Sequence, residues 1–131
     1  MCTFCNREEF ENNILFETED NMIIADLYPL AIGHIMVIPK KHHQYMHEVE
    51  FSVLEEQMKM IQKASIILRQ KFKGIDLNIL LCDGPKALQT IPHMHWHVVP
   101  RWGNDVGLDK LDSGTLKKIT TIQLDDLKKT V

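Results

Sequence analysis

The chain has 131 residues, of which 44% are hydrophobic and 25% are charged, enough material for one globular domain with a single core. Its formal net charge of -3 at pH 7, without a basic run carrying interleaved aromatic residues, argues against a nucleic-acid backbone as partner. No apolar run approaches the roughly 20 residues of a transmembrane helix, and the first residues show neither a basic n-region nor an apolar h-region. We therefore expect a cytoplasmic protein without membrane or nucleic-acid partners.

A Cys-x-x-Cys pair, Cys2 and Cys5, lies at the start of the chain. The odd total of three cysteines suits a metal-binding pair in a reducing compartment better than a disulfide framework. A redox pair of this kind normally follows a strand at the start of a helix, and no strand precedes residue 2. Metal binding is therefore favoured. Because the pair supplies only two thiolates, two further ligands must come from the His-rich segments.

The segment 12–26 predicts a hairpin of two short strands, because two apolar runs flank polar turn residues at 19–21. Asp26 follows the second strand directly and precedes Tyr28 and Pro29. From composition alone, this carboxylate suits an Asx turn as well as a functional role.

A third strand is predicted over 33–39, with His34 inside an otherwise apolar pattern. The clearest helix is predicted from Ser52 to Phe72, where Ser52 and Glu55 have the spacing of a capping box. At ~1.5 Å per residue the helix is about 30 Å long, which is enough to cross one face of a small sheet. Its apolar stripe, which we assign to the core, comprises Leu54, Met58, Ile61, Ser65, Leu68 and Phe72.

A fourth strand is predicted over 76–82, and a loop over 83–92 follows it. A loop of this composition can direct backbone N–H groups and a hydroxyl at an oxyanion without any net positive charge. Its informative residues are Gly84, Pro85, Gln89 and Thr90.

Three histidines alternate with apolar residues in the last predicted strand, so that His93, His95 and His97 share one face. A solvated face would normally carry Thr, Lys or Glu, and the triplet therefore indicates function. On a regular strand the outer two are about 13 Å apart, too far for one tetrahedral metal, so the three must have different roles. A neutral imidazole is a nucleophile that needs no prior deprotonation, which suits attack on phosphorus.

The tail, residues 103–131, is expected to pack on the domain or on a partner subunit. A turn is predicted at 112–114, and one or two short helical pieces are predicted over 115–129. The apolar side of these pieces comprises Leu116, Ile119, Leu124 and Leu127.

The pattern His-apolar-His-apolar-His-apolar-apolar-Pro-Arg at 93–101 resembles the signature of the histidine-triad (HIT) superfamily of nucleotide hydrolases and transferases. The segment 83–90 is similar to the phosphate-side loop of the dinucleoside polyphosphate hydrolase branch, and 33–42 matches the other long motif. The resemblance covers about residues 1–102, the HIT-like nucleotide-binding domain. We expect an α+β fold, an antiparallel sheet of about five strands with one long helix packed on a face, and the resemblance implies a homodimer.

The resemblance also implies a zinc site and a ribose contact. Family members with an N-terminal CxxC carry zinc completed by two histidines, which correspond here to His42 and His93, with His43 as a rival for His42. Four protein ligands close a tetrahedral sphere, so the zinc would be structural. Asp26, eight residues before His34, would contact the ribose hydroxyls, and His34 would support the triad.

The implied reaction is hydrolysis at the α-phosphorus of a purine nucleotide, with release of a nucleoside monophosphate. His95 would form a nucleotidyl-histidine intermediate that water resolves. His97 would hydrogen-bond the phosphate or bridging oxygen and protonate the departing group, while Gln89, Thr90 and loop amides would hold the non-bridging oxygens.

Two residues depart from the family pattern: Cys82 stands where Asn or Gln is usual, and Leu88 stands where a small residue is expected. Both departures concern which leaving group the site accepts. The alternatives are a nucleoside phosphoramidase that cleaves a P–N bond, a nucleotidylyl transferase, and a non-catalytic nucleotide-binding regulator.

Overall fold

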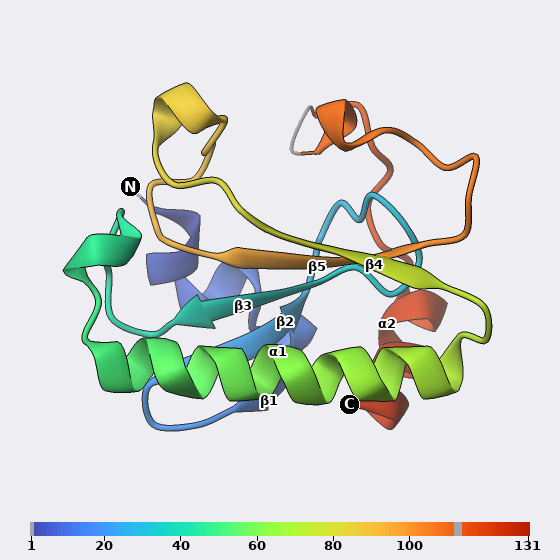
Figure 1. Cartoon of the computed structure of the whole chain (residues 1–131), viewed down its shortest axis with the longest axis horizontal. Coiled ribbons are helices and arrows are strands. Elements are labelled where there is room, and N and C mark those ends of the chain that lie inside the picture. Colours follow the sequence, from blue (N-terminus) through green and yellow to red (C-terminus); the bar gives the residue numbers. More distant parts are fainter. Residues whose placement is uncertain (1, 112–113) are drawn as a thin grey trace.

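In the described residues, 2–111 and 114–131 of this computed structural model, the centre of the fold is an antiparallel sheet of five strands (Figure 1). Their order across the sheet is β1-β2-β3-β5-β4. The sheet and the long helix on it confirm the predicted α+β class. The strands are β1 (Ile14–Glu17), β2 (Asn21–Ala25), β3 (Ile35–Pro39), β4 (Asp76–Leu81) and β5 (Trp96–Arg101).

The helices comprise two α-helices and several 3-10 turns. Neither α-helix of the described chain is long and apolar enough to span a bilayer. The α-helices are α1 (Phe51–Lys71) and α2 (Thr121–Thr130). The 3-10 turns are Thr3–Cys5, Arg7–Glu9, Glu11–Asn13, Met46–Glu48, Pro85–Ala87 and Leu108–Lys110.

The hairpin of β1 and β2 is confirmed, but the histidine strand is shorter than predicted. β5 begins at Trp96, so His93 and His95 precede it. The reason is local: the Met94 N–H donates to the His43 carbonyl at 2.7 Å, so the chain here bonds a loop and not the β3 ladder. Because His93 and His95 precede β5, the spacing of a regular strand does not apply to them.

Helix α1 packs on the sheet with a face that matches the predicted one in part, since Ile61 and Leu68 are buried in the core as expected. Its buried residues include Gln57 and Met60, while Met58 is 45% exposed. The pattern failed because the buried Gln57 amide is satisfied by hydrogen bonds, donating to Asn21 Oδ1 at 2.9 Å and accepting from Trp96 Nε1 at 3.0 Å. The predicted capping box is also wrong, since the N-cap is Glu50 and it makes no side-chain cap bond.

Two apolar clusters lie on opposite faces of the sheet, since alternate residues of β3 contribute to each. The helix-side cluster comprises Ile23, Ile35, Val37, Met60, Ile61, Ala64, Leu68, Ile75 and Val98. The second cluster includes the N-terminal turns and comprises Cys2, Phe4, Phe10, Met22, Ile24, Met36 and Ile38. His97 pairs with Met36 across β5 and β3, and it therefore faces the N-terminal turns.

The tail crosses back to the domain and ends in α2 (Figure 1). Thr120 and Gln123 form a capping box at its N-terminus. Leu127 is buried, and Lys71 of α1 bonds Asp126 of α2 at 3.0 Å. The predicted turn at 112–114 falls largely on residues 112–113, outside the described residues.

A candidate active site beside a candidate metal centre

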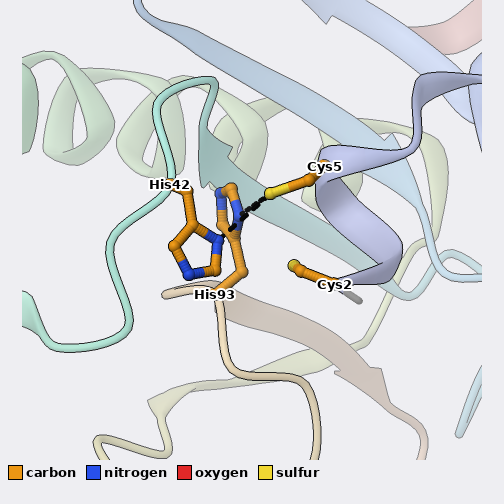
Figure 2. A group of neighbouring side chains, drawn as sticks. All are labelled: Cys2, Cys5, His42 and His93. Carbon is orange, nitrogen blue, oxygen red and sulfur yellow. Dashed lines mark hydrogen bonds between the residues drawn. The ribbon is translucent and has the colours of Figure 1, made fainter.

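Four residues from three separate segments converge at the N-terminal end of the molecule. Cys2 precedes the first 3-10 turn and Cys5 ends it, His42 follows β3, and His93 precedes β5 (Figure 2). Their potential ligand atoms all lie within 4.8 Å of one another. Cys5 Sγ is 3.1 Å from His42 Nδ1 and 3.7 Å from His93 Nδ1. The structure therefore brings together the four residues that the sequence suggested as metal ligands.

The chemistry of this donor set fits zinc, which prefers thiolate and imidazole ligands in a tetrahedral arrangement. The His93 Nε2–H donates to the Pro39 carbonyl at 2.7 Å, so the Nδ1 lone pair is directed at the cluster. Burial lowers the pKa of His93 and keeps the ring neutral, as a ligand must be. Desolvation and the neighbouring Cys2 thiol raise the pKa of Cys5, and a bound cation would favour the thiolate instead.

The structure also separates His42 from its neighbour His43. The side chain of His43 lies outside the four-residue group and lines a different cavity with Lys40 and Lys41. Its backbone carbonyl accepts the Met94 N–H. Adjacent residues point in different directions here, and His42 is the one that turns toward the cysteines.

The second histidine of the triad, His95, is held in one tautomer. Its Nδ1 lies 2.7 Å from the His93 carbonyl oxygen. A carbonyl only accepts, so we assign the proton to Nδ1 and the lone pair to Nε2. The ring is 2% exposed and contacts the edge of Phe4 with ring centroids 5.2 Å apart. A neutral imidazole fixed in this way has a nucleophilic nitrogen in a defined direction.

A hydrogen-bonded relay fixes the tautomer of His97. The Leu30 N–H donates to His34 Nδ1 at 2.9 Å, so His34 carries its proton on Nε2. That nitrogen lies 2.9 Å from His97 Nδ1, which therefore accepts. The neutral His97 ring then carries its proton on Nε2, where it can donate. The His95 and His97 rings are adjacent, with centroids 4.8 Å apart.

The local backbone that presents His34 depends on glycine. Gly33 has φ +89°, in the left-handed region, and a Cβ there would lie 2.8 Å from the Phe72 ring. Gly33 therefore allows the chain to enter β3 with the His34 ring directed at His97.

The carboxylate of Asp26 contacts this relay. Its Oδ1 accepts the Tyr28 N–H at 2.9 Å, which is the Asx turn that composition allowed. Its Oδ2 lies 3.3 Å from His34 Nε2 and 3.8 Å from His97 Nδ1. The side chain is nearly buried and also lines a cavity. Sequence reasoning missed the contact with the histidines, because nothing in the local pattern joins residues so far apart in the chain.

That cavity has a volume of about 430 Å³, within the range of small-molecule sites. Thr90 lines it, as expected of a substrate-binding residue. Gln89 does not, because its amide accepts from the Gly84 N–H at 3.1 Å and donates to the Gln44 carbonyl at 3.0 Å. Gln89 thus joins the two ends of the loop and ties the loop to the segment that contains Gln44. The lining residues that the sequence did not suggest are Thr3, Phe4, Leu27, Tyr28, Met36, Ile91, Gly114 and Leu116.

Known proteins are similar to this chain in sequence. The family model for the HIT domain matches residues 7–104. An uncharacterized HIT-like protein of Saccharolobus solfataricus is 30% identical over 112 residues, which cover 84% of this chain and 81% of that protein. A bis(5'-adenosyl)-triphosphatase of Saccharomyces cerevisiae is 27% identical over 112 residues, which cover 79% of this chain and 54% of that protein.

Solved structures share the fold. A hypothetical histidine triad nucleotide-binding protein from Sulfolobus tokodaii superposes with a TM-score of 0.82 at 31% identity, covering 98% of this chain and 88% of that one. A Zn-bound histidine triad family protein from Mycobacterium smegmatis superposes with a TM-score of 0.70 at 28% identity, covering 99% and 97%. With the HIT model matching most of its length and the triad, relay and sheet in place, the chain belongs to the HIT domain family.

Proposed function

We propose that the protein is a nucleotide hydrolase in which His95 Nε2 attacks the α-phosphorus and releases a nucleoside monophosphate. The observation that carries this proposal is the 2.7 Å bond from His95 Nδ1 to the His93 carbonyl, which leaves the lone pair of the neutral ring on Nε2. Attack forms a P–N bond to His95 and breaks the bond from phosphorus to the leaving oxygen. Water then attacks the same phosphorus, and His95 departs with its lone pair restored.

His97 is the proposed donor to the departing oxygen. The relay from His34 leaves its proton on Nε2, which can hydrogen-bond the phosphate or bridging oxygen as the leaving group departs. The Asp26 carboxylate beside both rings would stabilise positive charge as it develops there. Thr90 and the amides of the loop, which Gln89 holds closed, are the proposed ligands of the non-bridging oxygens.

The cavity beside Asp26 is the proposed nucleoside site. Its volume suits a purine nucleoside, and Asp26 is the carboxylate on its wall that can accept from ribose hydroxyls. The bis(5'-adenosyl)-triphosphatase relative from yeast supports adenine nucleotides as the first substrates to test.

Zinc is the proposed resident metal of the Cys2, Cys5, His42 and His93 group. When bound there, it would have four protein ligands and would act as a structural ion that holds the N-terminal turn against the segment before β5. The Zn-bound neighbour from Mycobacterium smegmatis supports this assignment.

We also propose a homodimer. β4 lies at one end of the strand order, and its Ile79 is 46% exposed although it pairs with Val98 of the helix-side core. An apolar edge strand of this kind favours pairing with a second copy.

A phosphoramidase and a nucleotidylyl transferase share this chemistry, and they differ in the leaving group and the acceptor. A phosphate leaves as a stable anion and needs only a hydrogen bond, whereas an amine must be protonated. The neutral His97 ring that the relay favours therefore supports anhydride substrates over P–N substrates.

The test is to rank diadenosine polyphosphates, adenosine phosphoramidates and nucleotide sugars by kcat/KM, with His95→Ala as the control. We expect diadenosine polyphosphates to rank first and to yield AMP. A phosphoramidate in first place would support the phosphoramidase. Tight AMP binding without turnover of any compound would support the non-catalytic regulator and contradict the proposal.

A further inference from the structure

The C-terminal segment that begins at Gly114 forms part of the cavity wall. Leu116 lines the cavity together with Gly114, while the remaining lining residues come from the N-terminal turn, the segment between β2 and β3, β3 itself, and the loop before His93. Both residues lie beyond residues 7–104, the part of the chain that matches the HIT model. This wall is therefore a feature of this chain in addition to its HIT domain.

Two anchors on the C-terminal side hold Leu116 in place. The Ile119 N–H donates to the Leu27 carbonyl at 2.7 Å, and Leu27 follows Asp26 and lines the same cavity. Helix α2 is fixed by the buried Leu127, which is 2% exposed, and by the 3.0 Å contact of Asp126 with Lys71. The C-terminal segment thus bonds Leu27 in the cavity wall at one point and helix α1 at another.

The lining of the cavity divides into a polar part and an apolar part. Asp26 contacts the relay and Thr90 belongs to the phosphate-side loop, so these two residues suit the ribose and the phosphate. The apolar part suits the flat faces of a base, and comprises Phe4, Leu27, Met36, Ile91 and Leu116.

We propose that Leu116 packs against the base of the bound nucleotide, and that the C-terminal segment therefore determines affinity for the nucleoside half of the substrate. This inference rests on the proposed function, since it takes the cavity to be the nucleoside site. An apolar side chain contributes contact area and makes no hydrogen bond to a base edge. Leu116 should therefore affect ground-state and transition-state binding equally.

The test is the substitution Leu116→Ala, with Leu116→Met as the conservative variant and Ile122→Ala as the matched control. Ile122 lies in the same tail but is 83% exposed and does not line the cavity. We expect Leu116→Ala to weaken AMP binding about five- to twentyfold by calorimetry, in keeping with the loss of a few methyl or methylene contacts. Affinity for inorganic phosphate, measured by NMR titration, should not change. Leu116→Met and Ile122→Ala should each bind AMP with an affinity close to that of the wild type.

In turnover, KM should rise by the same factor while kcat stays within about twofold. Hydrogen exchange of the wild-type peptide that contains Leu116 should slow when AMP is added, and this arm needs no variant. Unchanged AMP affinity in folded Leu116→Ala, or an equal loss of phosphate affinity, would overturn the inference. Because AMP binding needs no catalysis, a protein that turns over nothing would refute the proposed function and leave this result interpretable.

Discussion

One backbone group fixes the tautomer of His93, of His95 and of His34, and His34 in turn fixes that of His97. His93 donates to the Pro39 carbonyl and directs Nδ1 at the cysteines. His95 instead donates from Nδ1 to the His93 carbonyl, which leaves its lone pair on Nε2. His34 accepts from the Leu30 N–H and passes its own proton toward His97. These bonds support the different roles that we propose for four chemically identical rings: metal ligand for His93, nucleophile for His95, support for His34 and hydrogen-bond donor for His97.

Asp26→Asn tests whether the carboxylate acts on the histidines. From sequence, a ribose contact alone predicts a higher KM with little change in kcat. The 3.3 Å and 3.8 Å contacts of Asp26 with His34 and His97 add a charge that should matter in the transition state. We therefore expect kcat to fall about tenfold or more, together with a rise in KM, in steady-state kinetics. An unchanged kcat would restrict Asp26 to ribose binding.

At the scale of elements, the N-terminal turn links the metal group to the cavity. Thr3 and Phe4 lie between the two cysteines and line the cavity, and the Phe4 ring also contacts His93 and His95. A metal that fixes this turn would also fix part of the nucleoside site.

Cys2→Ser should therefore separate binding from chemistry. We expect loss of stoichiometric zinc by metal analysis and a lower melting temperature, since structural zinc contributes on the order of several kcal/mol or more to folding. Below that temperature KM should rise several-fold, because Phe4 loses its support, while kcat remains near wild type. A loss of kcat at unchanged KM would mean that the metal acts in the chemistry itself.

Ion pairs of Glu17 with Arg7 and Lys40 also hold the N-terminal segment. The Arg7 guanidinium, and after it Lys40, lower the pKa of Glu17 from its ordinary value of 4.5 to about 2. The folded chain then binds fewer protons than the unfolded chain between pH 4.5 and 2, so this stability is present above pH 4.5 and is lost as the pH falls toward 2.

Glu17→Gln should lower the melting temperature slightly at pH 7, by a few degrees at most because the groups are exposed. The difference from wild type should shrink as the pH falls through this window. Thermal unfolding of both proteins in identical buffers measures it. A difference that stays constant down to pH 2 would remove the electrostatic explanation.

The elements that followed a single local rule could be predicted from the sequence, and the exceptions have physical causes. The strand predicted over 33–39 is present as β3, and its Met36 and Val37 lie on opposite faces, as alternation along a strand requires. The face of α1 was correct for Ile61 and Leu68 but missed Gln57, whose buried amide is satisfied by hydrogen bonds to distant residues. The contact of Asp26 with the relay and the position of Leu116 on the cavity arise from packing between remote segments, which no local pattern contains.

At the scale of the whole molecule, the sheet separates two kinds of surface. One face carries α1 and the helix-side cluster (Figure 1). The other face carries the N-terminal turns, the group of Cys2, Cys5, His42 and His93, and the histidine relay. The strand β4 forms the edge of the sheet opposite to β1, and it is the edge at which we propose that a second copy pairs.

Ile79→Lys tests the proposed homodimer, since a charge on an edge strand opposes pairing. Light scattering should give twice the mass of the chain for the wild type and for Ile122→Lys, and one chain mass for Ile79→Lys. A wild-type protein of one chain mass at the concentration of the assay would refute the dimer.

The central claim is that His95 bonds covalently to phosphorus, and trapping the intermediate tests it most directly. The best substrate of the kcat/KM ranking, labelled at the α-phosphate, is mixed with the enzyme and quenched in alkali within a single turnover. Peptide mapping should find the label on the peptide that contains His95, stable in base and labile in acid, and should find none with His95→Ala. Product formed at the wild-type rate without a labelled peptide, or with the label on another residue, would contradict the account.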